Sequence, residues 1–272
     1  MRYAMIALVL MLAGVATAQD VITVKGSDTM VILAQRWAEQ YMTKHSATTI
    51  QVTGGGSGTG ISALINGTTD VCNSSRPMKK SERDKLKQRF GTLGVEIKCA
   101  QDGLAVYVNE TNPVTELTLQ QLKDIYTGDI TNWKDVGGND ERIILYSREN
   151  NSGTYVYFKD NVLGGQDFSP SAQNLPGTAS VVNAVARDKR GVGYGGSAYA
   201  KGIHELKLRK DANSTAYLPT IDNVKSGEYP ISRYLYMYLR NRPTGALKEY
   251  IDWILGDEGQ SIVSEVGYFP IR

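Results

Sequence analysis

Histidine and cysteine are scarce in this sequence, and neither sign of charge is in clear excess. The 272 residues include two histidines and two cysteines. That is too few for a metal cluster with several such ligands, or for a catalytic centre built on several histidines. Lys and Arg number 30 against 28 Asp and Glu, a formal net charge of +2. Nucleic-acid-binding proteins usually carry a strong basic surplus, so this near balance argues against that class.

A hydrophobic run long enough to span a membrane is also missing. Residues 4–15 are all apolar or glycine and follow Arg2, but a bilayer span takes roughly 20 apolar residues. The small residues Ala16 and Ala18 fit the pattern at which a secretory signal is cleaved. The sequence therefore predicts a signal peptide over residues 1–18, cleavage after Ala18, and export of the mature chain to the periplasm.

Export gives the two cysteines a second interpretation, because oxidising compartments permit disulfides. Cys72 and Cys99 lie at the ends of predicted strands. If those strands are neighbours, a Cys72–Cys99 bridge is geometrically possible. The alternative is a pair of buried free thiols, and two cysteines alone give little support for a metal site.

Segments rich in β-branched residues alternate with amphipathic ones along the chain. The periodicity predicts strands at 21–24, 49–52, around 71, 95–100, 104–108, 143–146, 191–194 and 229–239. It predicts helices at 30–44, 61–65, 81–90, 118–126, 155–162, 181–187, 247–255 and 258–266. Alternating strands and helices predict an α/β protein with a mainly parallel sheet. Because the alternation restarts in mid-chain without a flexible linker, we expect two lobes, continuous strands between them, and a ligand cleft at the carboxyl ends of strands.

Glycine, in contrast, is abundant: 28 of 272 residues, against a usual share of about 7%. Four loops combine small hydroxyl residues with a following helix: 26–29, 54–60, 74–76 and 152–154. A helix N-terminus offers unpaired N–H groups and about half a positive charge. Ordinary capping explains any one such loop, but four together favour a site for a compact anion. Arg148 would add a guanidinium that binds two oxygens of that anion, or else form a surface salt bridge.

The spacing in these loops excludes several common motifs. Residues 54–61, GGGSGTGI, lack the lysine of a P-loop and do not match GxGxxG. Thr59 stands where a GxSxG elbow centred on Ser57 needs glycine. His45 and His204 neighbour no serine–glycine loop, so a hydrolase or phosphatase would lack a base near its nucleophile. We therefore expect a binding protein without enzyme activity, with a secreted hydrolase or phosphatase as the alternative of another class.

The succession of GSDTM, GGGSGTGI, DVCNSSRPM, RENNSGT, GVGY and a closing GYFPI resembles the periplasmic phosphate-binding proteins of the high-affinity phosphate ABC transporter. The resemblance covers residues from about 24 to the C-terminus. It implies the type II periplasmic binding fold, in which two α/β lobes joined by two crossing strands close on one phosphate. Lobe I would comprise 19–104 and 233–272, and lobe II 105–232. The implied partner is a membrane ABC permease, and the protein would act as a monomer without a cofactor.

Carried over position by position, the resemblance implies phosphate ligands from all four loops. The implied ligands are Thr29, the Met30 N–H, Ser57, Ser75, Arg148, Ser152, the Gly153 N–H and Thr154. Gly58 is a further candidate in the second loop.

The third loop departs from the family pattern. Many family members have an aspartate there that accepts the proton-bearing oxygen of hydrogen phosphate, whereas this chain has Ser75 followed by Arg76. Serine donates or accepts, but ionised aspartate only accepts, so rejection of sulfate is expected to be weaker unless another acceptor substitutes. Asp28 is one candidate acceptor, with helix capping as its alternative. Arg76 either adds charge to the site or faces outward. A binder of sulfate, molybdate, tungstate or arsenate therefore remains an alternative.

Overall fold

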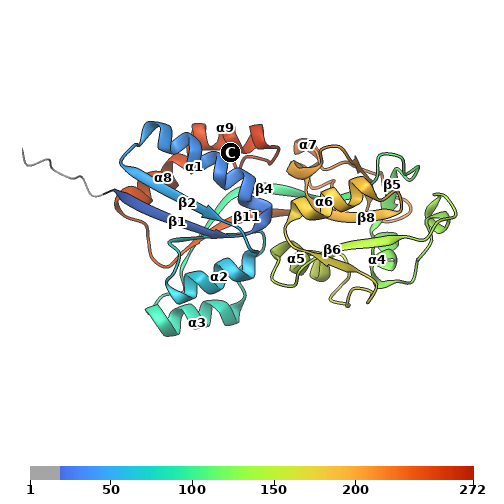
Figure 1. Cartoon of the computed structure of the whole chain (residues 1–272), viewed down its shortest axis with the longest axis horizontal. Helices are drawn as coiled ribbons and strands as arrows, with labels where there is room; N and C mark the ends of the chain where they lie inside the picture. The colour runs from blue at the N-terminus through green and yellow to red at the C-terminus, as the bar shows by residue number, and fades with distance from the viewer. Residues whose placement is uncertain (1–18) are drawn as a thin grey trace, which may run out of the picture.

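The computed structural model describes residues 19–272, so the predicted signal peptide and its cleavage after Ala18 lie outside the described residues. Figure 1 shows two α/β lobes side by side, joined by the strands β4 (Val95–Val108) and β11 (Ser232–Leu239). The predicted fold class is confirmed. Within the described residues, no helix has both the length and the apolar character that a membrane span requires.

The sheet of lobe I places the last strand of the chain between two earlier ones. β1 (Asp20–Gly26) pairs in parallel with β2 (Thr48–Thr53) and β3 (Val71–Ser74). β11 then pairs antiparallel with β3 on one side and with β4 on the other. The expected parallel order therefore holds for the first three strands, but the crossing strands are antiparallel.

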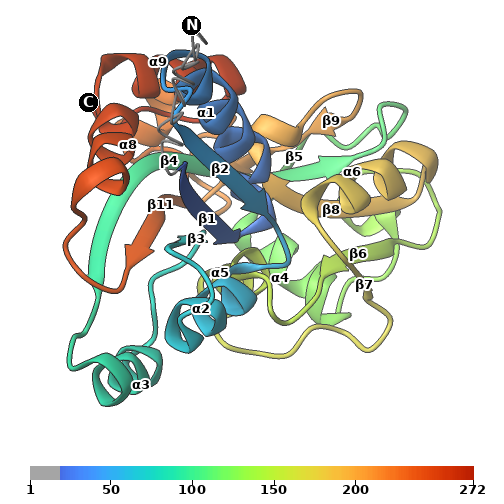
Figure 2. The ribbon, with the colours of Figure 1, turned by 60° about the vertical axis from the view of Figure 1, so that its left-hand side comes forward.

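Helices cover both faces of this sheet (Figures 1 and 2). They are α1 (Val31–Lys44), α8 (Gly245–Leu255) and α9 (Asp257–Val266) on one face, and α2 (Ser57–Asn66) and α3 (Lys80–Phe90) on the other. Side chains alternate across a pleated strand, so Leu235 and Met237 of β11 pack under α1, α8 and α9. Tyr236 and Tyr238 pack with α2 and α3. Because both faces are buried, β11 is an almost continuous apolar and aromatic run.

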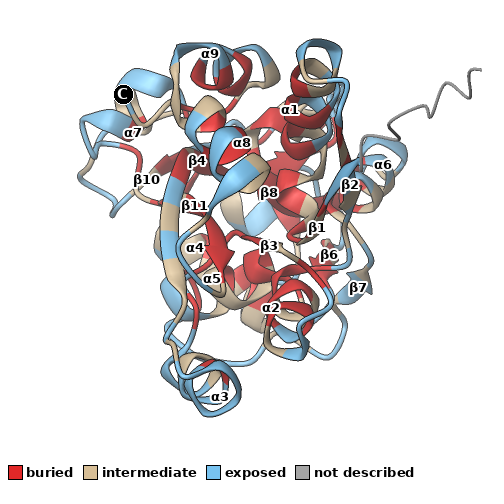
Figure 3. Cartoon of the chain, turned by 90° about the vertical axis from the view of Figure 1, so that its left-hand side faces the viewer, coloured by how far each residue is buried: buried red, intermediate tan, exposed pale blue. Residues whose placement is uncertain are grey.

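β4 is one continuous strand, although the sequence predicts two. Its residues 95–103 pair with β11, and residues 104–108 pair antiparallel with β8 (Gly191–Gly196) of lobe II. β6 (Ile144–Arg148) then lies parallel to β8 and β7 (Gln173–Leu175). The remaining elements of lobe II are β5 (Glu116–Thr118), α4 (Leu119–Thr127), η2 (Trp133–Val136), α5 (Gly153–Asn161), α6 (Thr178–Arg187), η3 (Ser197–Tyr199), β9 (His204–Glu205), β10 (Lys207–Arg209) and α7 (Ile221–Lys225). Figure 3 shows the strands of the central sheet largely buried and the outer side of α3 exposed.

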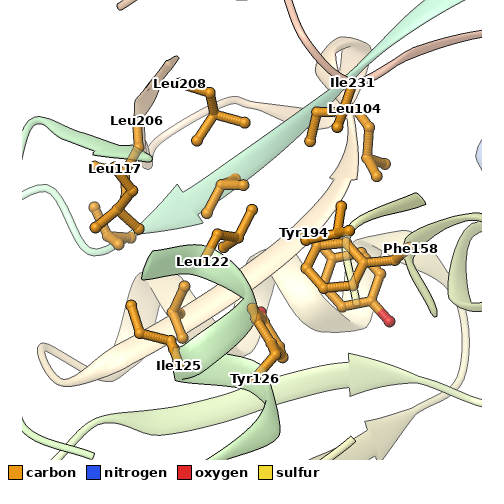
Figure 4. Close-up of a cluster of buried hydrophobic side chains, with 14 of the residues drawn as sticks. Leu104, Leu117, Leu122, Ile125, Tyr126, Phe158, Tyr194, Leu206, Leu208 and Ile231 are labelled. Atoms are coloured by element: carbon orange, nitrogen blue, oxygen red, sulfur yellow. The ribbon is translucent and has the colours of Figure 1, made fainter. Parts of the chain in front are cut away.

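A cluster of buried hydrophobic side chains in lobe II, which includes Phe158 and Tyr194, packs α5, β6 and β8 together (Figure 4). The Phe158 ring of α5 stacks on Tyr194 of β8, with centroids 4.0 Å apart. The Tyr194 hydroxyl lies 2.8 Å from Ser147 Oγ on β6. Burying such rings contributes about 1.5–3 kcal/mol each. The start of α5 and the end of β6 are therefore held by a packed core.

The predicted Cys72–Cys99 disulfide is wrong. β11 separates β3 from β4 in the sheet, so the strands that carry the cysteines are not neighbours. Strands two places apart are about 9–10 Å from one another, whereas bridged cysteines need Cα atoms within roughly 7 Å. Both thiols are free and buried, as in the alternative interpretation, and Cys99 Sγ lies 3.4 Å from the Leu235 carbonyl.

These thiols should be chemically silent in the folded protein. Burial raises the pKa of both the Cys72 and the Cys99 thiol well above the ordinary value, and only a thiolate is nucleophilic. We expect no reaction with a thiol reagent such as DTNB until the protein is unfolded, when both thiols titrate. A disulfide would give no titratable thiol in either state, and rapid labelling of the native protein would contradict the burial.

Candidate functional site

The four predicted loops meet where the two lobes face one another. They belong to η1 (Asp28–Met30), the start of α2, the end of β3 and the start of α5. The predicted ligand residues here, including Met30 with its N–H group, are at most 2% exposed: Thr29, Met30, Ser57, Ser75, Arg148, Ser152 and Thr154. The structure therefore brings all the predicted ligands into one buried region between the lobes.

Direct contacts close this region from both sides. Thr29 Oγ1 of lobe I and Thr154 Oγ1 of lobe II are 2.8 Å apart. The Gly58 N–H of lobe I donates to the Asn151 carbonyl of lobe II at 2.9 Å. Asn151 Nδ2 donates in return to the Gly55 carbonyl at 3.1 Å. Gly58 therefore serves an interlobe hydrogen bond, and the expected cleft is closed in this structure.

The start of α5 is shaped for close approach. Ser152 is its N-cap, because its hydroxyl accepts from the N–H groups of Thr154 and Tyr155 at 3.2 and 3.3 Å. Gly153 follows, and a Cβ added there would lie 2.3 Å from Ser57 Oγ of lobe I. Only glycine lets the two loops come this near.

The second and third loops share hydroxyl groups. Ser57, the first residue of α2, accepts from the Ser75 N–H at 3.0 Å, and its Oγ lies 3.4 Å from Ser75 Oγ. The residue before it, Gly56, has φ 89°, a conformation that favours glycine. This turn places two buried hydroxyls together at the N-terminus of a helix, where negative charge is favoured.

Arg148 is a buried cation fixed at the end of β6. Its Nη2 donates to Asp28 Oδ2 at 2.7 Å and its Nη1 to Thr178 Oγ1 at 2.8 Å. Its Nε has no hydrogen-bond partner in the part of the chain that the structure describes. Burial lowers the pKa of Arg148 and the Asp28 carboxylate opposes that shift, but a guanidinium stays charged in proteins. The surface salt bridge alternative is wrong for Arg148, which is 1% exposed.

Asp28 connects the first loop to the second loop and to Arg148 at the end of β6. Its Oδ2 accepts from Arg148, and its Oδ1 accepts from the Gly55 N–H at 2.7 Å. The N-caps of η1 and α1 are Ser27 and Met30, and both Asp28 oxygens accept from residues outside these two helices. Asp28 therefore does not cap a helix. The carboxylate instead lies beside the buried cation of the site, where a proton acceptor would be needed.

The Arg76 guanidinium forms an ion pair with Glu82. Its Nη1 and Nη2 donate to the two carboxylate oxygens of Glu82, on α3, at 2.9 and 2.7 Å. The outward-facing interpretation is wrong, because Arg76 is 6% exposed. Its charge is balanced by Glu82 of α3, whereas Arg148 pairs with Asp28 of the first loop.

Sequence reasoning missed Arg233, a third buried arginine. Arg233 on β11 donates to Asp102 on β4 through Nε and Nη2, at 3.0 and 2.8 Å, and to Thr154 Oγ1 at 3.1 Å. Asp102 and Arg233 are register partners in the two crossing strands. The available signal was Arg233 itself, the only charged residue in an almost entirely apolar and aromatic strand.

Two α/β lobes that bury a polar site between them define a solute-binding protein of the periplasmic type. Residues 13–258 match the model of the PBP superfamily domain. The chain is 33% identical to the phosphate-binding protein PstS of Pseudomonas aeruginosa, over 90% of this chain and 81% of that protein. It is 34% identical to the PstS of Staphylococcus epidermidis, over 90% and 77%. The chain belongs to the PBP superfamily and, within it, to the family of phosphate-binding proteins named PstS.

Two solved structures of proteins described as phosphate receptors or transporter components are similar to this chain. A putative phosphate ABC transporter substrate-binding protein from Clostridium perfringens, with bound phosphate, has a TM-score of 0.84 and 29% identity, covering 93% of this chain and all of that one. An ABC-type phosphate transport receptor from Vibrio cholerae has a TM-score of 0.73 and 32% identity, covering 91% and 99%.

Proposed function

We propose that this protein binds inorganic phosphate between its lobes in the periplasm and delivers it to an ABC-type phosphate permease, with no enzyme activity of its own. The observation that carries the proposal is the buried Arg148 guanidinium. Its Nη groups donate to Asp28 and Thr178, and its Nε is buried with no hydrogen-bond partner among residues 19–272. Such a site suits one small oxyanion and has no exposed basic surface for a polyanion. Membership of the PstS family supports the same ligand and partner.

The proposed ligands follow from which donors are still available. They are Thr29, Met30, Ser57, Ser75, Arg148, Ser152, Gly153 and Thr154. The Ser152 hydroxyl accepts two N–H bonds and keeps its own hydrogen to donate. The Met30 N–H also donates to the Ser27 carbonyl at 3.0 Å, and helix termini commonly share a donor in this way. Gly58 is left out because its N–H donates to Asn151. Arg76 is left out because both of its Nη groups pair with Glu82, which neutralises its charge, although its Nε has no partner among residues 19–272.

Hydrogen phosphate differs from sulfate in the proton it carries, so discrimination requires an acceptor. Asp28 is the carboxylate nearest the proposed cation, paired with Arg148 at 2.7 Å. Each carboxylate oxygen has two acceptor positions, and each Asp28 oxygen is engaged once here. We therefore assign the acceptor role to Asp28 in place of the family aspartate that Ser75 replaces.

Lobe closure on the anion is part of the proposal. We place the division after residue 104 and before residue 233, as expected from the resemblance. The composition of the hydrophobic clusters supports it: apart from Leu104 and Phe269, the main cluster of lobe II lies within residues 105–232. Apart from Ala198, the main cluster of lobe I comes from residues 22–100 and 235–268. We propose a monomer that opens and closes about β4 and β11, with closure biased by the ligand.

Calorimetry on phosphate-stripped mature protein tests the function. We expect phosphate to bind with a Kd of about 1 μM or tighter, which corresponds to about 8 kcal/mol. Sulfate, molybdate and arsenate are titrated in parallel on the same preparation. Heat with sulfate and none with phosphate would establish the alternative oxyanion binder instead.

Replacing Ser75 by the family aspartate tests the selectivity argument. Ser75→Asp adds an acceptor-only group to the buried loop. It should lower the affinity for fully ionised sulfate, relative to phosphate, by about tenfold or more through like-charge repulsion. Ser75→Asn is the matched control, because it has the same size without the charge. If the sulfate-to-phosphate ratio is the same for both variants, the assignment of this loop to the anion site fails.

A further inference from the structure

A buried ion pair links the two crossing strands outside the four loops. Arg233 and Asp102 lie opposite one another in the antiparallel register of β11 and β4. Their side chains are 3% and 0% exposed. Removing two charges from water is costly unless further hydrogen bonds satisfy them. Asp102 Oδ1 accepts from the Ser197 N–H at 3.2 Å, so the carboxylate is a fixed anchor for the guanidinium.

Arg233 extends from this anchor to the start of α5. Its Nη2 donates to Thr154 Oγ1 at 3.1 Å, and its guanidinium lies 5.3 Å from the centre of the Tyr157 ring. Thr154 and Tyr157 are three residues apart and share one face of the helix. The Nη1 atom of Arg233 is buried and has no hydrogen-bond partner among residues 19–272. Arg233 therefore holds the helix whose first turn forms part of the proposed anion site.

The contact also constrains the Thr154 hydroxyl. A hydroxyl has one hydrogen and two acceptor positions. Arg233 fills one acceptor position, so the hydrogen points away from the guanidinium. Thr29 Oγ1 lies 2.8 Å away, and either hydroxyl of that pair can be the donor. A hydroxyl that accepts from a cation is also polarised and becomes a stronger donor.

We propose that Arg233 is a positioning residue for anion binding: anchored by Asp102, it directs the Thr154 hydroxyl to donate toward the bound anion. The proposal rests on the proposed function, because it assumes an anion among the four loops. If Arg233 has this role, the crossing strands β4 and β11 contribute to anion recognition as well as forming the hinge between the lobes.

The first test separates this role from plain structural support. Arg233→Gln alone leaves the buried Asp102 carboxylate without its cation and is expected to destabilise the fold. The double variant Asp102→Asn with Arg233→Gln replaces the ion pair by two neutral amides. We expect its Tm to return close to that of the wild type, while its Kd stays roughly 30-fold weaker. Recovery of both Tm and affinity would overturn the proposal. Arg83→Gln is the control, because it removes a guanidinium–carboxylate pair with Glu96 far from the site.

A double-mutant cycle then tests whether Arg233 acts through Thr154. The amide pair is introduced into wild type and into Thr154→Val, and Kd is measured for phosphate and for sulfate. We expect the amide pair to weaken binding by less than about threefold once the hydroxyl is absent. Fully additive losses would overturn the proposal. A wild-type protein that binds sulfate in place of phosphate contradicts the proposed function alone, and the cycle is then decided on sulfate. A wild-type protein that binds neither anion overturns both.

Discussion

Arg148→Ala should weaken phosphate binding by about 10³-fold, on the order of 4 kcal/mol. The substitution removes the buried cation that the loops surround and leaves the Asp28 carboxylate without its partner at 2.7 Å. Both effects act in the same direction, because the unpaired carboxylate repels the incoming anion. Calorimetry on phosphate-stripped protein measures the loss, and the Tm without ligand reports how far the fold itself is affected.

A double variant separates the loss of the cation from the repulsion by the unpaired Asp28 carboxylate, and a second variant serves as a control. Adding Asp28→Asn to Arg148→Ala removes the repulsion and should restore part of the affinity, but not all of it. Arg190→Ala is the matched control, because the Arg190 side chain is 51% exposed and pairs only loosely with Asp188 at 3.7 Å. A Kd for Arg148→Ala within about threefold of wild type would remove Arg148 from the site.

Gly153→Ala should block lobe closure with little effect on folding. The added Cβ would lie 2.3 Å from Ser57 Oγ and 2.7 Å from Ser75 Oγ, both on the other lobe. If this clash raises the free energy of the closed state by about 3 kcal/mol, the apparent affinity falls by roughly 150-fold. The helix itself favours alanine over glycine, so the Tm of the ligand-free protein should not drop.

Small-angle scattering gives a second measurement for this variant. Wild type should contract when phosphate is added, whereas Gly153→Ala should not. Gly256→Ala is the control, because Gly256 has φ −81° and a Cβ there would meet no atom closer than 3.3 Å. Normal affinity together with normal contraction would show that the loops can separate at this point without penalty.

The candidate site was largely predictable because its signals are local. Glycine and hydroxyl residues before a helix favour an anion site wherever the helix lies, and the four loops do meet. The partner of each charged residue was not predictable in the same way. Asp28 satisfies Arg148, 120 residues away, and Glu82 takes Arg76 away from the site. Such choices depend on how the loops lie in space, which spacing along the chain does not specify.

In the fold, too, the local features were predictable from the sequence and the long-range arrangement was not. Periodicity identified the longer strands and most helices, but the order of the strands was decided by tertiary packing. The chain inserts β11 between β3 and β4, and that single placement separates Cys72 from Cys99. It also sets Asp102 opposite Arg233, 131 residues away. Short elements such as β7 and α7 have too few residues to show a period and were missed.

The position of β11 also affects the order in which the protein can assemble. The chain emerges from its N-terminus, and domains generally fold in that order. Lobe II comes almost entirely from one uninterrupted stretch, so its contacts can form early. The sheet of lobe I stays split between β3 and β4 until residues 232–239 emerge, followed by α8 and α9. All four predicted anion loops have emerged by residue 154, yet the final forty or so residues must arrive before these loops can face one another.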